Sequence, residues 1–273
     1  MVDFEFKSNY DVNDFRRVME ILRGKNGCPW DREQTHESIR RNVLEEAYEV
    51  AEAIDENDPE HLKEELGDLM MQVMFHSRME EEKGVFNLDD VADGAVKKLI
   101  LRHPHVFGNL QVADSAEVLK NWDDIKRKEK SQVTTTKSMV DVAETLPALW
   151  RAEKIQKKAA KTGFEWPDIS GAMKKVHEEA DELQQAVDND DAANIEEELG
   201  DLMFAAVKVA RFAGVDPEAA LHKSCEKFIN RFRFVEEKAA AAGKNLEDMS
   251  LDEMEVYYQQ ARHELEGKPE QWC

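Results

Sequence analysis

An internal repeat constrains the fold of this chain more than any other feature of its sequence. The seven residues Glu64-Glu-Leu-Gly-Asp-Leu-Met70 recur letter for letter as Glu197-Glu-Leu-Gly-Asp-Leu-Met203. An upstream block, Glu45-Glu46-Ala47-Tyr48-Glu49, is matched by Glu178-Glu179-Ala180-Asp181-Glu182 at the same offset of 133 positions. Because loops tolerate changes of length, a constant offset indicates a unit of fixed internal geometry. We therefore predict two homologous domains.

Weaker matches extend the repeat outward and set its limits. The pattern Lys25-x-Gly27-x-x-Trp30 is answered by Lys161-x-Gly163-x-x-Trp166, and Lys98-x-x-x-Arg102 is answered by Lys227-x-x-x-Arg231. Between the two copies lies the polar stretch Ser131-Gln-Val-Thr-Thr-Thr-Lys-Ser138, which is typical of a linker. We predict an N-terminal domain at 10–128, a linker at 129–144 and a C-terminal domain at 145–265.

The hydrophobic pattern predicts an all-α fold of two tandem helical bundles. Apolar residues recur at three- and four-residue spacing over 38–53 and 172–187, and Asn57-Asp-Pro59 and Asp188-Asn-Asp-Asp191 then break the pattern. Each copy should therefore contain a helix, a short turn and a second, antiparallel helix. Later helices are expected at 88–100, 116–128, 217–242 and 251–266, and no segment alternates as a strand does.

Charge and composition exclude several classes of function. The formal net charge is -22, which disfavours attraction to nucleic acid or to an anionic membrane, so any bound phosphate needs a local cation. No apolar run approaches the roughly 18 residues of a membrane span, and the start of the chain lacks the pattern of a signal peptide. Cys28, Cys225 and Cys273 are too far apart to suggest disulfides or a zinc site. We expect a cytoplasmic protein.

The repeated acidic residues have the spacing of a metal site. Glu179 and Glu182 lie three apart on one helical face, and Glu198 and Asp201 do the same on the next helix. Four carboxylates can thus converge between the paired helices. Leu199, Leu202 and Met203 are expected to anchor the second helix in a core, which would place the acids at a buried boundary where like charges need cations.

Two further features bear on the same interpretation. Gly67 and Gly200 are unfavourable in mid-helix, which suggests a close approach of backbone or ligand. Oxygen ligands without Glu-x-x-His favour Mg²⁺, or Mn²⁺, over di-iron. The alternative is an ordinary solvated helix face, the usual explanation of a single EExxE pattern. The acidic pattern occurs twice with identical spacing, which argues against that alternative.

Several motifs together resemble the MazG family of nucleoside triphosphate pyrophosphohydrolases. They are Gly27-Cys-Pro-Trp-Asp31, Gln34-Thr-His36, both acidic blocks and Arg102-His-Pro-His-Val-Phe107. The resemblance implies an all-α homodimer that hydrolyses nucleoside triphosphates, ATP among them, to monophosphate and pyrophosphate with Mg²⁺, in nucleotide housekeeping. It also implies that the metal ligands are Glu179, Glu182, Glu198 and Asp201, with Glu46, Glu49, Glu65 and Asp68 as their counterparts in the first domain.

The reaction needs an activated water and charge neutralisation on the phosphates. We assign the general base to Glu178 or Glu197, and phosphate contacts to Lys175, Lys227 and Arg231, unless these cations only pair with neighbouring carboxylates. Tyr258 stands where family members commonly have a stacking tryptophan. The predicted substrate-binding set is Lys175, Glu178, Glu179, Glu182, Glu197, Glu198, Asp201, Lys227, Arg231 and Tyr258.

Other questions stay open at the level of sequence. Trp30 and Trp166 are equally compatible with core positions and with other roles. We expect the second domain to be the main catalyst, because only its last helix carries Tyr257 and Tyr258. Two alternatives to an enzyme are a helical dimer that binds a protein partner and a sensor that binds nucleotide without hydrolysis. Base and sugar preference cannot be read from spacing.

Overall fold

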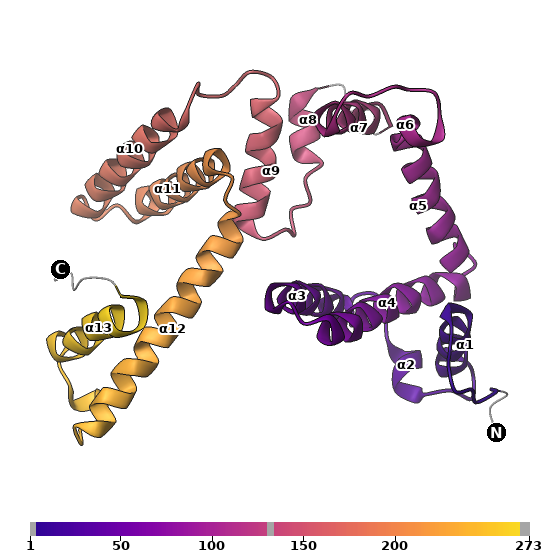
Figure 1. Cartoon of the computed structure of the whole chain (residues 1–273), viewed down its shortest axis with the longest axis horizontal. Coiled ribbons are helices and arrows are strands. Elements are labelled where there is room, and N and C mark those ends of the chain that lie inside the picture. The colour runs from indigo at the N-terminus through magenta and orange to yellow at the C-terminus, as the bar shows by residue number, and fades with distance from the viewer. Residues whose placement is uncertain (1–3, 130–133, 268–273) are drawn as a thin grey trace. The chain divides into compact units, whose positions relative to one another are not determined.

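A computed structural model describes residues 4–129 and 134–267, and it confirms the all-α fold: this part of the chain contains helices and no strand (Figure 1). The chain divides into two compact units, Met1–Lys126 and Arg127–Cys273. Part of the predicted linker, residues 130–133, lies outside the described residues, and another part forms helix α8 (Thr135–Val140). None of the described helices has the combined length and apolar character needed to cross a membrane.

The first unit is built around a small apolar core. Its helices are α1 (Val12–Arg23), α2 (Pro29–Glu33), α3 (Arg40–Glu56), α4 (Pro59–Glu82), α5 (Leu88–Arg102), α6 (Pro104–Phe107) and most of α7 (Ser115–Glu129), which crosses the boundary at Lys126. The buried core side chains are Met19 of α1, Ile39 before α3, and Met74, Phe75 and Met79 of α4. Because these residues join α1 to α4 and to the start of α3, they fix the helical pair that carries the first acidic block.

The pairing of α3 with α4 is set by a turn of two residues. Asn57 ends α3 in the left-handed conformation (φ 56°), which asparagine tolerates better than most residues. Asp58 then caps α4 by accepting hydrogen bonds from the backbone N–H groups of Glu60 and His61, and Pro59 occupies the first helical position. The predicted helix, turn and helix are thus confirmed here.

The second unit repeats this hairpin. Its elements after α8 are α9 (Ala148–Ala160), α10 (Ile169–Asp188), α11 (Ala192–Ala213), α12 (Pro217–Ala241), the 3₁₀ turn η1 (Leu246–Asp248) and α13 (Leu251–Glu266). Figure 1 shows α10 and α11 lying side by side and α13 folding back along α12. The turn again contains a left-handed residue, Asp190 (φ 53°), and Asp191 caps α11 by accepting from the N–H of Asn194.

Two expectations about the acidic helix of the second unit need correction. Leu199 and Met203 do not anchor α11 in a core, because they are 41% and 52% exposed within the unit. The inner face of α11 is instead lined by the smaller Ala205 and Val207, which are buried. The close approach of backbone or ligand expected at Gly200 is not made by backbone: among the described residues outside its own helix, no atom lies within 4 Å of a Cβ built there. The approach of a ligand stays a prediction.

Candidate active site

The paired helices of the second unit bring three of the four predicted ligands together. Carboxylate oxygens of Glu179 and Glu182 on α10 and of Glu198 on α11 all lie within 4.8 Å of one another. Glu179 is only 4% exposed, and the other two are half-buried. Asp201 is exposed and lies outside this group. Its negative charge nevertheless helps to raise the pKa of Glu198. We call Glu179, Glu182 and Glu198 the acidic cluster.

The carboxyl groups of the cluster have unequal electrostatic surroundings. Lys175 Nζ lies 2.6 Å from Glu179 Oε1, and this contact lowers the pKa of Glu179. The pKa of Glu182 is raised, first by its hydrogen bond with Glu179 and then by burial. Burial raises the pKa of Glu198, and the charge of Glu179 adds to the effect. Keeping these neighbouring carboxylates ionised costs free energy, and a bound divalent cation would reduce that cost. Carboxylate oxygens are also the ligand atoms that Mg²⁺ prefers.

The first unit contains the equivalent arrangement. Oxygens of Glu46, Glu49 and Glu65 lie within 4.8 Å of one another, and Asp68 is again outside the group. Burial raises the pKa of both Glu46 and Glu65. One difference from the second unit is that Gln72 of α4 donates from Nε2 to Glu46 Oε1 at 3.2 Å.

The two residues predicted to act as a base lie at the edge of the acidic cluster. Glu178 is exposed, and its Oε1 accepts a hydrogen bond from Lys175 Nζ at 2.6 Å. Glu197 is exposed on α11, and its charge helps to raise the pKa of Glu198. Both carboxylates are therefore open to solvent beside the grouped oxygens, which is where a base that takes a proton from water must lie.

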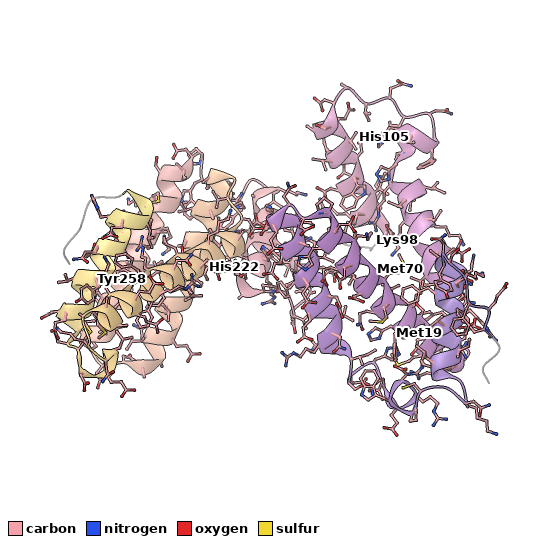
Figure 2. All side chains as sticks on the ribbon, turned by 60° about the horizontal axis from the view of Figure 1, so that its bottom comes forward. Met19, Met70, Lys98, His105, His222 and Tyr258 are labelled. Carbon is pink, nitrogen blue, oxygen red and sulfur yellow. The ribbon has the colours of Figure 1, made fainter. Side chains whose placement is uncertain are left out.

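The predicted phosphate cations of α12 and the predicted stacking residue form a separate group. Arg231 donates from Nε and Nη2 to the carboxylate of Glu266 at 2.6 and 2.8 Å, and its guanidinium lies over the ring of Tyr258. Tyr258 sits where α13 packs on α12 (Figure 2). Lys227 is exposed. Within the described residues, no ion pair joins Lys227 or Arg231 to the acidic cluster.

A pocket of about 310 Å³ adjoins the acidic cluster of the second unit. Its lining includes Lys175, Glu179 and Asp201 from the predicted site. It also includes residues that the sequence analysis did not assign, namely Gln156 on α9, Phe164 and Trp166 in the loop before α10, and Ala205 and Lys208 on α11. Trp166 is 38% exposed, so it is a pocket wall and not a core residue. Trp30 is more exposed still.

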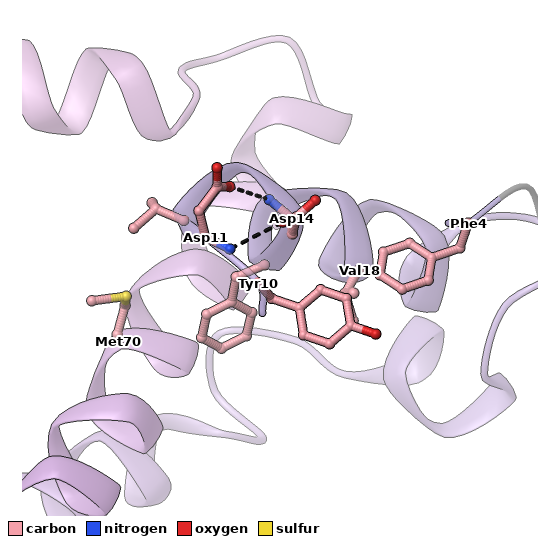
Figure 3. Close-up of a pocket in the computed structure, with 8 residues that line it drawn as sticks. Phe4, Tyr10, Asp11, Asp14, Val18 and Met70 are labelled. Atoms are coloured by element: carbon pink, nitrogen blue, oxygen red, sulfur yellow. Dashed lines mark hydrogen bonds between the residues drawn. The ribbon is translucent and has the colours of Figure 1, made fainter. Parts of the chain in front are cut away.

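A pocket in the first unit lies in a different place. This cavity, of about 540 Å³, is lined by Phe4, Tyr10, Val18 and Met70 among others (Figure 3). The dashed bonds in Figure 3 belong to the capping box of α1, in which Asp11 and Asp14 bond each other's backbone N–H. None of Glu46, Glu49 and Glu65 lines this cavity, so it is an apolar pocket apart from the acids.

Comparison with known proteins gives consistent matches. The family described as "MazG nucleotide pyrophosphohydrolase domain" matches twice, at residues 34–107 and 169–235. A Thermotoga maritima protein named nucleoside triphosphate pyrophosphohydrolase/pyrophosphatase MazG is 42% identical over 90% of this chain and 93% of its own length. An Escherichia coli K12 protein named nucleoside triphosphate pyrophosphohydrolase is 44% identical over 90% of this chain and 95% of its own length. Both matched segments contain an acidic block.

Proposed function

Since this chain belongs to the MazG family of nucleotide pyrophosphohydrolases, we propose that it hydrolyses nucleoside triphosphates to monophosphate and pyrophosphate in a Mg²⁺-dependent reaction at the acidic cluster of the second unit. Family membership makes the chain an enzyme of the nucleoside triphosphate pyrophosphohydrolase class. The observation that carries the choice of site is the convergence of three partly buried glutamates beside a pocket.

The acidic cluster suits a hard divalent cation. Glu179, Glu182 and Glu198 would hold it, with Asp201 one helical turn beyond Glu198 as the fourth predicted ligand. When bound, Mg²⁺ supplies positive charge to the phosphate oxygens and lowers the pKa of water, and Mn²⁺ can do the same. The raised pKa values of Glu182 and Glu198 support this assignment, because the charge of Lys175 offsets the effects of burial and of the neighbouring carboxylates only in part.

The protein's own residues supply the remaining chemistry. Glu178, or Glu197 as the alternative, accepts the proton of the attacking water, since each is exposed beside the cluster. Lys175 holds Glu178 and Glu179 at 2.6 Å each and can transfer one of its hydrogen bonds to a phosphate oxygen. Lys227 and Arg231 remain proposed phosphate contacts, and Tyr258 a proposed base contact. For Arg231, this role requires release from Glu266.

A homodimer would account for the apolar residues left uncovered beside both acidic blocks. Leu199 and Met203 in the second unit are exposed, and so are their counterparts Leu66 and Met70 in the first. Exposed apolar side chains in such a row are typical of an interface. Sedimentation equilibrium of the full chain measures the state of association. We also propose a cytoplasmic location, supported by the free thiols of Cys28 and Cys225.

Pyrophosphate release from a panel of nucleoside triphosphates, with Mg²⁺ and with a chelator, tests the proposed function. Glu198→Gln should abolish release, whereas Glu196→Gln, the same change at an exposed position of α11 outside the cluster, should retain it. A chain that is stabilised thermally by nucleotide and Mg²⁺ but releases no pyrophosphate would be a sensor. A chain that shows neither effect would fit the non-enzymatic dimer.

A further inference from the structure

The hairpin that carries the acidic cluster is held at both ends. The turn at 189–191 joins α10 to α11 at one end, and at the other, which we call the open end, the two helices are not joined by the chain (Figure 1). We infer that Glu165, in the loop before α10, is a positioning residue that holds the open end and so keeps the glutamates of the cluster at the spacing that a divalent cation needs. The inference rests on the proposed function for the cation.

Glu165 joins its loop to the end of α11 through its carboxylate. Its Oε2 accepts a hydrogen bond from Arg211 Nη2, and its Oε1 lies 3.6 Å from Lys208 Nζ. The three side chains are only 11–18% exposed, so water screens these ion pairs less than it screens pairs on the surface. Burial lowers the pKa of Lys208, which means that its charged form gains from a carboxylate nearby. Without Glu165, two largely buried cations would lose this partner.

The same carboxylate also fixes the residue that separates the two helices at the open end. Glu165 Oε1 accepts a hydrogen bond from the backbone N–H of Trp166 at 3.0 Å. The indole of Trp166 packs on the first turn of α10 at Gly171, where any side chain would collide with the ring. On its other side, Lys208 Nζ of α11 lies 4.6 Å from the ring centre. Gly171 is one helical turn before Lys175, which contacts the acidic cluster, so a shift of the indole would move α10 close to the carboxylates.

The first unit holds the same end of its hairpin with different residues. His36, in the segment before α3, contacts the end of α4 twice: its Nδ1 is 2.7 Å from His76 Nδ1, and its Nε2 is 2.6 Å from Glu80 Oε1. At the offset of 133 positions, His76 and Glu80 correspond to Val209 and Ala213, beside the two cations that hold Glu165. Each copy therefore ties the segment before its first paired helix to the end of the second helix. What the two copies share is the position of this tie, which supports a role in holding the acidic block that they also share.

Binding of Mn²⁺ without nucleotide, measured by the electron paramagnetic resonance of the free ion, tests the inference in the full-length chain. Glu65→Gln serves as the reference protein, because it leaves three grouped carboxylates only in the second unit. Glu165→Gln, or Trp166→Leu, which leaves the charges in place, is then added to the reference. Each should raise the Kd for Mn²⁺ about tenfold, the size of effect seen when a residue that orients metal ligands from outside is lost. Glu144→Gln, the same change at an exposed position before α9, is the matched control and should bind as the reference does.

Circular dichroism at the temperature of the titration should show that each protein is folded, so that a change in Kd does not reflect unfolding. A residue that serves stability alone would lower Tm and leave the Kd unchanged, and that result for Glu165→Gln overturns the inference. Should Glu165→Gln not fold, Glu165→Asp, which keeps the charge but shortens its reach, takes its place and should weaken binding in the same direction.

Metal binding and turnover separate this inference from the proposed function. If the variants lose Mn²⁺ affinity as expected but the wild-type chain releases no pyrophosphate, the proposed function fails and the role of Glu165 stands. If the wild-type chain releases pyrophosphate and Glu165→Gln binds Mn²⁺ as the reference does, the function stands and the inference fails. A reference protein that binds no Mn²⁺ would refute both the metal site and the inference.

Discussion

Glu179, Glu182 and Glu198 meet at one point of the second unit but differ in what surrounds them. Lys175 lowers the pKa of Glu179, whereas a hydrogen bond with Glu179 raises that of Glu182 and burial raises that of Glu198. Glu179 is thus the residue that keeps its negative charge most readily, and the other two gain most from an added cation. Lys175 of α10, which contacts both Glu178 and Glu179, therefore organises the cluster before any ligand arrives.

Replacing Glu178 by glutamine should slow catalysis more than it weakens binding. The amide keeps the shape of the side chain and can still contact Lys175, but it cannot accept a proton from water. We expect kcat to fall by about 100- to 10,000-fold, the usual contribution of a general base, with KM changed by much less. Steady-state pyrophosphate release measures both constants.

The matched control for Glu178→Gln is Asp181→Asn, the same change from carboxylate to amide at an exposed position of α10. It should leave kcat near that of wild type. Should Glu197→Gln instead cause the large fall while Glu178→Gln remains active, the base is Glu197. Full activity in both variants would exclude either residue as the base.

Sequence spacing predicted the three glutamates that meet in each unit, but it also placed Asp201 and Asp68 with them, and these lie outside the groups. Residues three apart share a helical face, so the grouping of Glu179, Glu182 and Glu198 followed once two helices were paired. Spacing says nothing about contacts between elements distant in sequence. The pairing of Arg231 with Glu266 and the buried amide of Gln156 therefore appeared only in three dimensions. The signal for Gln156 is a polar residue on the inward face of an amphipathic helix.

A second group of titratable side chains lies in the first unit, away from its acids. His36 Nδ1 is 2.7 Å from His76 Nδ1, and His36 Nε2 is 2.6 Å from Glu80 Oε1, which also pairs with Lys83. The pKa of His76 is lowered, first by burial and then by His36. Since two protonated rings cannot share the Nδ1 to Nδ1 hydrogen bond, acid should break it.

The sign of the resulting pH dependence follows from the lowered pKa of His76. The unfolded chain binds a proton more readily than the folded one, so this residue's stability contribution is complete above the ordinary histidine pKa and is lost as pH falls through the folded value. Thermal melting at pH 7.5 and pH 5 should show a smaller acid loss for His76→Gln than for wild type. His222→Gln, at an exposed position of α12 (Figure 2), should show the wild-type loss. Equal losses in both variants would contradict the prediction.

At the scale of elements, the turns between paired helices hold the site in register. Asn57 and Asp190 both adopt positive φ, at 56° and 53°, and each is followed by an aspartate that caps the next helix. This geometry reverses the direction of the chain within a few residues. It packs α10 against α11 in the second unit and α3 against α4 in the first. The position of the carboxylates thus depends on a backbone conformation that few residues tolerate.

Asp190→Val should destabilise the second unit and reduce activity. A β-branched side chain is strained at positive φ, at a cost of about 1 to 3 kcal/mol. Asp190→Gly, which tolerates this conformation, should stay within about 1 kcal/mol of wild type. Urea denaturation of both variants measures the difference in the free energy of unfolding. Equal stability of the two variants would show that the turn does not constrain the hairpin.

Hydrophobic periodicity along the sequence predicted the positions of several helices well. Predicted helices at 38–53, 88–100, 217–242 and 251–266 correspond to α3, α5, α12 and α13. It did not reveal that Leu199 and Met203 would lie outside the core, because hydrophobic periodicity identifies an apolar face but not what covers it. Helices α1 and α9 were not predicted, although both help to build the units.

At the scale of the whole molecule, the two copies of the repeat have the same grouped glutamates but different residues around them. Both units group three glutamates within 4.8 Å, but only the second unit's cluster has Lys175, and its counterpart in the first unit is Asn42. Gln72 also occupies space beside Glu46 that Ala205 leaves open beside Glu179. A metal site alone does not position a nucleotide, so the two copies should differ in activity.

The pair Glu65→Gln and Glu198→Gln tests this difference in the full chain, because the two residues occupy equivalent positions of the repeat. Each change removes one carboxylate from one cluster and leaves the other cluster intact. Glu198→Gln should remove nearly all pyrophosphate release. Glu65→Gln should retain at least about half, since in the first unit Asn42 replaces the lysine and Gln72 bonds Glu46 where the second unit has Ala205. Circular dichroism and sedimentation should show that both variants keep the wild-type fold and association. Equal losses in the two variants would mean that both copies catalyse or that each needs the other, and a loss confined to Glu65→Gln would assign catalysis to the first unit.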